Sequence, residues 1–361
     1  MRELSRLDIF GERLASNYEV IQSLAPQARI LPMVKANAYG HGLQKISQFL
    51  LHECLAPALG VASLGEALEI KTDRPVWVFS ETLLQPQFAS HFKKNIYPVV
   101  SDLTGLEFFL SAPEFKTHPL MIKIDTGMNR LGIAREEWPE AQKLIVQSGR
   151  KSIQHLMSHF ATSYYQQKAG DMISRQMQCF REAQSFFASS FTIEETSMSN
   201  SGAIEQGLMV EESWVRPGLM LYGPGSFKTQ TKMISRFSTR VMKLKAYERG
   251  TPIGYGVYVT PEAGLIALLP IGYGDGFFTQ SSGFNLKING IEGKVFGRVN
   301  MDMTAVFFKQ EAAGKIKVGD EVVLWDENPQ ELLDWATQMQ THSYQAMCGI
   351  SSRIPRVYHL G

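Results

Sequence analysis

A regular alternation of short apolar runs and helix-like stretches fills the first two-thirds of the chain and constrains its fold more than any other feature. Runs of this length are typical of buried strands, and intervening helices are typical of a parallel sheet. Eight such units predict a closed (β/α)8 TIM-like barrel of the α/β class. An open doubly wound sheet is the alternative, but the dinucleotide-binding glycine pattern that it often carries is missing after the first run. The expected strands span residues 30–35, 58–63, 76–80, 96–101, 120–125, 155–159, 197–201 and 215–222, and the expected helices include 63–72, 103–110, 139–147 and 174–187.

The sequence changes character after about Gly225. From about Phe237 the apolar runs are short, β-branched and separated by glycines, which indicates a mostly β second domain. We therefore expect a barrel domain over residues 1–228 and a C-terminal β domain over residues 229–361. The expected strands of the second domain span residues 239–244, 265–269, 284–288, 294–299, 304–308 and 321–324, with one helix near residues 329–340.

The composition excludes several kinds of partner. The chain has 361 residues, a hydrophobic fraction of 44% and a formal net charge of +1, so we expect a well-packed core and no nucleic-acid partner. No apolar run approaches the length of a transmembrane helix, and the first residues are too polar for a secretory signal, so we expect a cytoplasmic protein with no membrane partner. Cys54, Cys179 and Cys348 lie far apart without metal-ligand spacing, which predicts neither a disulfide framework nor a metal site.

The first apolar run ends at Lys35, which is followed by small, turn-forming residues that include Ala36, Asn37 and Gly40. This pattern places an amine at the carboxyl end of a buried strand, where (β/α)8 barrels assemble their active sites. A lysine amine that is removed from water loses its proton readily and can form a Schiff base. The alternative interpretation is a solvated lysine at a strand end.

Polar residues also occur on or after other expected strands. Lys123 and Asp125 lie on the same side of their strand, because side chains alternate, and charges in a barrel strand must be paired or functional. His159 ends the next expected strand. The structural alternatives are an ion pair that involves Asp125 and a hydrogen-bonded histidine without a catalytic role.

The last two expected barrel strands end in small and polar residues. Asn200 and Ser201 end the seventh strand, and Arg216 and Gly218 lie in the eighth. Barrels often bind phosphate with backbone N–H groups of the loops after these two strands. Ordinary glycine and proline loops are the alternative interpretation.

Two tyrosines of the second domain, Tyr255 and Tyr273, each lie between glycines. Glycine gives the backbone the freedom that lets an aromatic side chain project from a tight turn. Met301 lies in a polar loop after another expected strand. Each of these features alone is equally compatible with a turn or with packing.

Taken together and in this order, the segments resemble those of alanine racemases, which are fold-type III pyridoxal-phosphate enzymes. The resemblance runs from about Leu7 to Tyr358; segment 35–42 is its most specific part, and segments 123–132, 216–223, 270–276 and 297–302 support it independently. It implies an isomerase that interconverts L- and D-alanine and supplies D-alanine for peptidoglycan. It also implies a head-to-tail homodimer in which the second domain of one subunit completes the active site of the other.

The resemblance implies two catalytic residues. Lys35 would bind pyridoxal 5'-phosphate covalently and act as the base on one face of the substrate Cα, and Tyr255 of the partner subunit would be the base on the opposite face. Racemisation requires two such bases, because one removes the proton and the other returns it from behind. The resemblance also implies that the cofactor phosphate is bound by Tyr39, Ser201, Gly218 and Leu219, with Asn200 lining that phosphate cup. His159 would contact the cofactor ring. The substrate would be bound by Arg130, Met301 and Tyr273, of which Tyr273 would come from the partner subunit.

Arg216 would bond the pyridine nitrogen of the cofactor. Arginine stays protonated in proteins and only donates hydrogen bonds, so that nitrogen would carry no proton of its own. The ring would then be a weaker electron sink, and side reactions such as transamination would be suppressed. Lys123 would be a candidate for carbamylation, as the matching lysine often is in this family, which would place an anion beside Arg130.

One departure from the family pattern bears on specificity. Ser352 stands where many alanine racemases are expected to have a tyrosine that narrows the entrance, so a broader-specificity amino-acid racemase is one alternative. A fold-type III decarboxylase is another, but it typically carries a triple-glycine phosphate loop and a cysteine–aspartate pair, and neither occurs here. A non-catalytic pyridoxal-phosphate carrier would lack the second domain.

Overall fold

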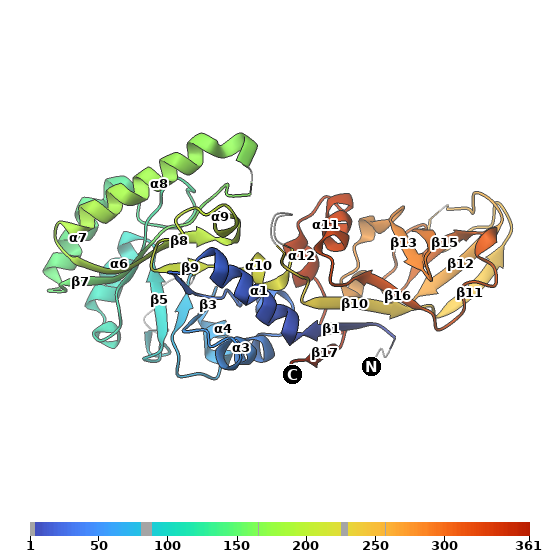
Figure 1. Ribbon diagram of the computed structural model, residues 1–361, viewed down its shortest axis with the longest axis horizontal. Helices are drawn as coiled ribbons and strands as arrows, with labels where there is room; N and C mark the ends of the chain where they lie inside the picture. The colour runs from blue at the N-terminus through green and yellow to red at the C-terminus, as the bar shows by residue number, and fades with distance from the viewer. Residues whose placement is uncertain (1–3, 81–88, 165, 225–229, 257) are drawn as a thin grey trace.

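The computed structural model describes residues 4–80, 89–164, 166–224, 230–256 and 258–361. Figure 1 shows an elongated molecule, with an α/β part at one end and a mostly β part at the other. In the part of the chain that the structure describes, no helix combines the length and the apolar character needed to cross a membrane. The predicted division at residue 228 falls outside the described residues and stays a prediction.

The first part is a barrel of eight parallel strands in the order β2-β9-β8-β7-β6-β5-β4-β3. A parallel bridge between Met33 and Gly60 joins its two edges: Val34 N donates to Gly60 O at 2.8 Å, and Gly60 N donates to Pro32 O at 2.9 Å. The barrel is therefore closed, and the predicted fold class is confirmed. The strands are β2 (Arg29–Ile30), β3 (Leu59–Val61), β4 (Val76–Val78), β5 (Ile96–Val100), β6 (Met121–Lys123), β7 (Ser152–Met157), β8 (Thr192–Asn200) and β9 (Trp214–Arg216).

Helices connect and cover the barrel strands (Figure 1). A capping box explains where one of them begins, because Ser63 Oγ accepts from Glu66 N while the Glu66 carboxylate accepts from Ser63 N. The helices are α1 (Gly11–Leu24), α2 (Lys35–Tyr39), α3 (Leu43–His52), α4 (Leu64–Glu69), α6 (Leu103–Ser111), α7 (Trp138–Gln147), α8 (Gln166–Ala188), α9 (Ser201–Glu205) and α10 (Leu219–Tyr222).

The predicted strand 215–222 is wrong in its second half. Strand β9 ends at Arg216, and residues 219–222 form α10 instead. Pro217 and Gly218 separate the two elements: proline cannot donate to a sheet ladder, and glycine weakens a strand. The apolar run therefore belongs to two elements, and the break between them lies at the carboxyl end of the barrel.

The second part contains two sheets, one of five strands (β11-β12-β15-β14-β13) and one of four (β16-β10-β1-β17). Its strands and helices are β10 (Ser235–Arg240), β11 (Lys243–Tyr247), β12 (Gly264–Leu269), β13 (Asn285–Ile288), β14 (Ile291–Val295), β15 (Thr304–Lys309), β16 (Glu321–Trp325), α11 (Pro329–Gln338) and α12 (Ser343–Cys348). The predicted single strand 239–244 is wrong, because the chain leaves one sheet at Arg240 and enters the other at Lys243.

The first strand of the chain, β1 (Arg6–Phe10), was not predicted and belongs to the four-stranded sheet. It pairs antiparallel with β10 and parallel with β17 (Arg356–His359), so segments from both ends of the sequence lie side by side. The N-terminal strand thus joins strands that follow the barrel in the sequence, and only then does the chain enter the barrel.

An aromatic core places α11 and α12 beside the barrel. Trp335 of α11 packs on Trp325 and Phe277, with ring centroids 5.6 and 5.4 Å apart. Helix α12 then approaches the segment after β2 so closely that a Cβ on Gly40 would lie 2.2 Å from the Met347 carbonyl oxygen. Gly40 also has a positive φ of 86°, so glycine is required there on both grounds.

Candidate active site

The lysine predicted as the reactive amine begins a left-handed turn. Residues 36–39 have φ values of 53°, 55°, 52° and 52°, although none is glycine, so Lys35 is followed by a left-handed helix and not by an ordinary loop. Left-handed backbone costs L-residues roughly 1–2 kcal/mol each. Such strain persists only where the surroundings fix the chain, and it gathers at functional sites.

Hydrogen bonds from outside the turn hold it. Ala36 N donates to Glu66 Oε1 at 2.7 Å, and Leu43 N donates to Asn37 Oδ1 at 2.8 Å. Ala38 N donates to the carbonyl oxygen of Val34 at 2.8 Å. The turn thus fixes the backbone on which Lys35 stands at the carboxyl end of the barrel.

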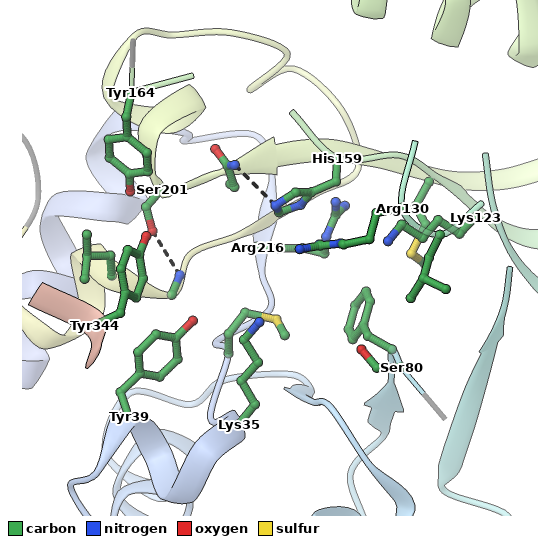
Figure 2. Close-up of a pocket in the computed structure, with 17 residues that line it drawn as sticks. Lys35, Tyr39, Ser80, Lys123, Arg130, His159, Tyr164, Ser201, Arg216 and Tyr344 are labelled. Atoms are coloured by element: carbon green, nitrogen blue, oxygen red, sulfur yellow. Dashed lines mark hydrogen bonds between the residues drawn. The ribbon is translucent and has the colours of Figure 1, made fainter. Parts of the chain in front are cut away.

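A pocket lies at this end of the barrel, and residues that follow or end six different strands line it (Figure 2). It brings together ten of the predicted site residues. Its lining includes four cations and no acidic residue among those that the structure describes, so the pocket favours an anionic ligand. The lining residues are Met33, Lys35, Tyr39, Phe79, Ser80, Lys123, Arg130, Leu131, Met157, His159, Tyr164, Asn200, Ser201, Arg216, Gly218, Leu219 and Tyr344.

One side of the pocket is a cup of hydroxyl and backbone N–H groups. Ser201 Oγ accepts from Gly218 N at 3.0 Å and from Met220 N at 3.2 Å. The hydroxyl of Tyr39 lies so close to Gly218 that a Cβ there would be 2.3 Å from it. Neutral donors that converge in this way suit a phosphate group, and any side chain at position 218 would displace Tyr39.

Two further tyrosines, which were not predicted as site residues, extend this cup. The Tyr164 hydroxyl is hydrogen-bonded to Ser201 and to Tyr344, and Figure 2 shows the three hydroxyls converging. Desolvation by burial, followed by the neighbouring Tyr344, raises the pKa of Tyr164, so its hydroxyl stays protonated. A Cβ on Gly202 would lie 3.1 Å from the Tyr164 ring, so the absence of a side chain at this glycine leaves space for the ring.

Ser352 and the pocket lie apart in the structure. Ser352 does not line the pocket; it lines a separate surface hollow with residues that include Gly42, Gln44 and Tyr358. The C-terminal tyrosine that enters the pocket is Tyr344 on α12, whose ring lies 5.9 Å from that of Tyr39. A serine at position 352 does not reach this pocket, so the expectation of a widened entrance stays a prediction.

Arg216 is 4% exposed and is held by hydrogen bonds to neutral groups. It donates to Ser197 Oγ and to the carbonyl oxygen of Ser158, and more weakly to that of Met198 at 3.5 Å. Burial lowers its pKa to about 10, so the guanidinium is still charged at neutral pH. The pocket therefore contains a fixed cation that can only donate hydrogen bonds.

Lys123 is 7% exposed and lies beside the arginines of the pocket (Figure 2). Burial, and after it the charges of Arg216 and Arg130, lower its pKa to about 8, whereas Asp125 acts in the opposite direction. No ion pair joins Lys123 to Asp125 in the described chain; the Asp125 carboxylate accepts from Gly127 N at 2.8 Å and Asn129 N at 3.1 Å. A structural Lys–Asp pair thus does not explain Lys123.

The same physics acts on Lys35. Desolvation and, secondly, the charge of Arg130 lower the pKa of its amine, while Glu66 raises it. A larger fraction of the amine is therefore neutral near pH 7 than for a solvated lysine, and the neutral amine is the form that attacks a carbonyl. The Lys35 side chain is nevertheless exposed in the single chain, so the alternative of a solvated lysine at a strand end stays open.

Asn200 fixes the state of His159. Its Oδ1 accepts from Ala203 N at 3.1 Å and from Ser163 Oγ at 2.7 Å, so its Nδ2 must be the donor toward His159 Nε2 at 3.4 Å. The His159 Nε2 atom is then an acceptor. Burial and the nearby cations, Arg216 first among them, lower the pKa of His159 well below its ordinary value, so this histidine is neutral.

Three predicted site residues lie outside the pocket. Tyr255, Tyr273 and Met301 belong to the second domain and are 72%, 46% and 53% exposed. Tyr255 follows β11 and precedes β12, which Figure 1 places at the end of the molecule away from the barrel. Their predicted roles require a second subunit and stay predictions.

Comparisons with known proteins agree with this arrangement. Residues 9–225 match the family model described as alanine racemase, N-terminal domain, and residues 234–358 match that described as alanine racemase, C-terminal domain. The alanine racemase of Vesicomyosocius okutanii is 31% identical over 358 residues, which cover 96% of this chain and 97% of that protein. The alanine racemase of Staphylococcus saprophyticus is 31% identical over 368 residues, which cover 96% of this chain and 92% of that protein.

Solved structures are similar over almost the whole chain. That of alanine racemase from Acinetobacter baumannii has a TM-score of 0.81 at 28% identity and covers 99% of this chain and 100% of that one. The fold and the pocket define a two-domain barrel enzyme whose site lies at the carboxyl ends of the barrel strands. The chain belongs to the alanine racemase family, and the prediction of an isomerase is confirmed.

Proposed function

We propose that this protein interconverts L- and D-alanine with pyridoxal 5'-phosphate bound covalently to Lys35. The observation that carries the proposal is the pocket itself, which combines a lysine amine of lowered pKa, a hydroxyl and N–H cup and a buried arginine. A structural relative at 24% identity, from Bartonella henselae, is described as an alanine racemase with covalently bound pyridoxal phosphate.

The residues of the pocket suit the cofactor. The cup formed by Tyr39, Ser201 and Gly218 would hold its phosphate, and Tyr164 and Tyr344 would add hydroxyl donors. The described lining residues include four cations and no acidic residue, which matches the negative charge of the cofactor. When bound, the cofactor withdraws electron density from the substrate Cα and so makes its proton removable.

Arg216 would set how strongly that density is withdrawn. Its guanidinium only donates, so it would hold the pyridine nitrogen of the cofactor with a hydrogen bond and leave that nitrogen unprotonated. Such restrained electron withdrawal would favour return of the proton to Cα over competing reactions. A carboxylate at this place would favour the protonated ring of a decarboxylase, and Arg216 therefore disfavours that alternative. Ser352 lies outside the described pocket, and a broader-specificity racemase stays the alternative that this serine suggests.

Racemisation also needs a base on each face of the substrate Cα. Lys35 would take or give the proton at its Nζ on one face, and Tyr255 of the partner subunit would do so at its hydroxyl on the other. The exposure of Tyr255, 72% in the single chain, supports a role at a subunit interface. Arg130, Met301 and Tyr273 would bind the substrate, and supply of D-alanine for peptidoglycan remains an expectation from the family.

We further propose that Lys123 is carbamylated. Carbamate formation requires a neutral amine, and the lowered pKa of Lys123, about 8, makes that form available near neutral pH. The resulting anion would lie beside Arg130 and Arg216 and would remove a conflict of like charges. The test is the intact mass of the protein under gentle ionisation, with a neutral-loss experiment as the control for the loss of carbon dioxide. A mass without one added carbon dioxide would contradict this proposal.

A chiral assay of purified protein with L-alanine in deuterated water tests the main proposal, with and without added pyridoxal phosphate. We expect D-alanine that carries deuterium at Cα. Turnover of serine without turnover of alanine would overturn the choice of substrate. Bound cofactor without exchange of any Cα proton would overturn the racemase mechanism.

A further inference from the structure

A column of polar side chains runs through the interior of the barrel below the pocket. His155 on β7 and Ser197 on β8 are both 0% exposed. The interior of such barrels is normally filled by branched apolar side chains, so a buried histidine and serine there call for an explanation. Trp77 packs against His155 with ring centroids 4.7 Å apart, which fixes the imidazole plane.

The column connects Arg216 to a carboxylate near the opposite end of the barrel. Arg216 Nη1 donates to Ser197 Oγ, and Ser197 Oγ lies 2.7 Å from His155 Nε2. On its other side, His155 Nδ1 faces Glu195 Oε2 at 3.6 Å. Glu195 also accepts from Trp214 Nε1 at 2.6 Å and from Arg29.

The donors and acceptors along the column have one consistent direction. Ser197 Oγ accepts from Arg216, because arginine can only donate, and His155 Nδ1 faces a carboxylate, which can only accept; with its hydrogen on Nδ1, a neutral His155 therefore accepts at Nε2 from the Ser197 hydroxyl. His155 is then neutral, with its hydrogen on Nδ1 directed toward Glu195. Burial lowers the pKa of His155 to about 4, which agrees with the neutral state.

Glu195 supplies the negative charge. Although desolvation raises the pKa of its carboxyl, the neighbouring His155 and the hydrogen bonds from Arg29 and Trp214 outweigh it and lower that pKa to about 2. Among the described residues, none of the hydrogen-bond partners of Arg216 is acidic, and the other charged side chains that line the pocket are cations. An uncompensated buried cation is costly, so a polarised path to a carboxylate stabilises it.

We propose that His155 and Ser197 are positioning residues that orient the Arg216 guanidinium and couple it to the charge of Glu195. The two residues fix one end of a guanidinium whose other hydrogen bonds go to carbonyl oxygens of the barrel wall. The consequence for the cofactor rests on the proposed function, in which Arg216 faces the pyridine nitrogen. The column itself is a property of the protein alone.

The chain offers matched controls for both residues. Ser199 lies on the same strand, is also 0% exposed, and donates to the carbonyl oxygens of Leu208 and Met209 without touching Arg216. His118 is 5% exposed near the same end of the barrel as Glu195, and its Nε2 lies 3.1 Å from the Lys93 carbonyl oxygen. Comparing S197A with S199A, and H155L with H118L, separates loss of the column from loss of a buried polar group. Thermal midpoints check that each variant is folded.

Two measurements test the column. In the holoenzyme, we expect S197A and H155L to lower kcat/KM by about tenfold or more, which corresponds to one lost hydrogen bond to a charged group. The absorption spectrum of bound pyridoxal phosphate should shift in these variants and not in the controls. In the protein without cofactor, ¹⁵N spectra of labelled histidine should show His155 as the neutral Nδ1–H tautomer, which S197A should disturb and S199A should not.

The outcomes are distinguishable. Equal effects of S197A and S199A, or a His155 that is protonated or carries its hydrogen on Nε2 at neutral pH, would overturn the column. A wild-type protein that binds no pyridoxal phosphate would overturn the proposed function instead, and the histidine spectra would still decide whether the column exists.

Discussion

The barrel pocket and the tyrosine loops of the second domain are built in opposite ways. Pocket side chains such as Arg216 and Lys123 are 4% and 7% exposed, and several elements of the same chain fix them. Tyr255, in contrast, is 72% exposed and lies apart from the pocket. The difference teaches that one chain preorganises the cofactor half of the proposed site, whereas the opposite half would acquire its surroundings from a second molecule in the proposed dimer.

The largest effect is expected from a variant that disrupts the barrel pocket. Lys35→Ala removes the amine that would hold the cofactor, so we expect loss of the bound-cofactor absorption and of essentially all racemase activity. Lys45→Ala, at an exposed position of α3, is the control and should leave both unchanged. Racemisation by Lys35→Ala at the wild-type rate would contradict the assignment of Lys35 as the cofactor-binding residue.

Tyr255→Phe disrupts the half of the proposed site that the second domain contributes. The variant should keep the cofactor spectrum but lose about 10²–10⁴-fold in kcat, the typical contribution of a positioned acid or base. Tyr258→Phe, in the same connection between β11 and β12, is the matched control. Full activity of Tyr255→Phe would sink the two-base assignment.

Mixing the two inactive variants sharpens the comparison. In a dimer with shared sites, a Lys35→Ala subunit paired with a Tyr255→Phe subunit contains one doubly altered site and one intact site. Random pairing makes half of the dimers mixed, so about a quarter of the wild-type activity should return after joint refolding. If both residues acted within one chain, no activity would return.

Acid should weaken the protein through buried barrel histidines. Desolvation lowers the pKa values of His41 and His155 from 6.5 to about 4, so the unfolded chain binds more protons than the folded one between these values. The free energy of unfolding should therefore fall as pH drops from 6.5 toward 4.5, by about 1.4 kcal/mol per pH unit and histidine at most. Denaturant titrations across this range measure the slope, which His155→Leu should reduce; a flat profile would contradict the prediction.

The hydroxyl cup offers a smaller effect. Tyr164→Phe keeps the ring against Gly202 but removes the hydroxyl that contacts Ser201 and Tyr344, so pyridoxal phosphate should bind up to about tenfold more weakly, as for one lost hydrogen bond. Tyr97→Phe, on strand β5 and outside this pocket, is the control. Equal cofactor affinity in wild type and Tyr164→Phe would show that the Tyr164 hydroxyl does not contribute to phosphate binding.

Local sequence signals were enough for the barrel and for much of the pocket. Apolar runs mark buried strands, and a polar residue at the end of such a run, as at Lys35 or His159, must lie at the carboxyl edge of a parallel barrel. Residues at the ends of different strands are therefore expected to lie close together, although the sequence gives no distances. This reasoning places the strand-end residues of the pocket, whereas Tyr39, Arg130 and Leu219, and the role of every site residue, came only from the resemblance to alanine racemases.

Long-range and strained features could not be anticipated in this way. Tyr344 reaches the pocket from more than 300 positions beyond Tyr39, through packing of α11 and α12 that no local pattern announces. Strand β1 exists only because β10 and β17 flank it. The left-handed turn after Lys35 opposes the intrinsic preference of its own alanines, so only its tertiary hydrogen bonds explain it.

That turn provides the smallest and most local test. At Ala36, with a φ of 53°, Ala→Gly removes the clash that disfavours left-handed backbone, roughly 1–2 kcal/mol, but adds about 0.5–1 kcal/mol of unfolded-state entropy. We therefore expect Ala36→Gly to raise the free energy of unfolding by about 0.5–1 kcal/mol. Ala15→Gly, inside the right-handed α1, should lower it by about 1 kcal/mol. Opposite signs for one chemical change, measured by denaturant unfolding, would establish that the strain is stored beside Lys35, whereas equal losses would mean that the turn is not strained.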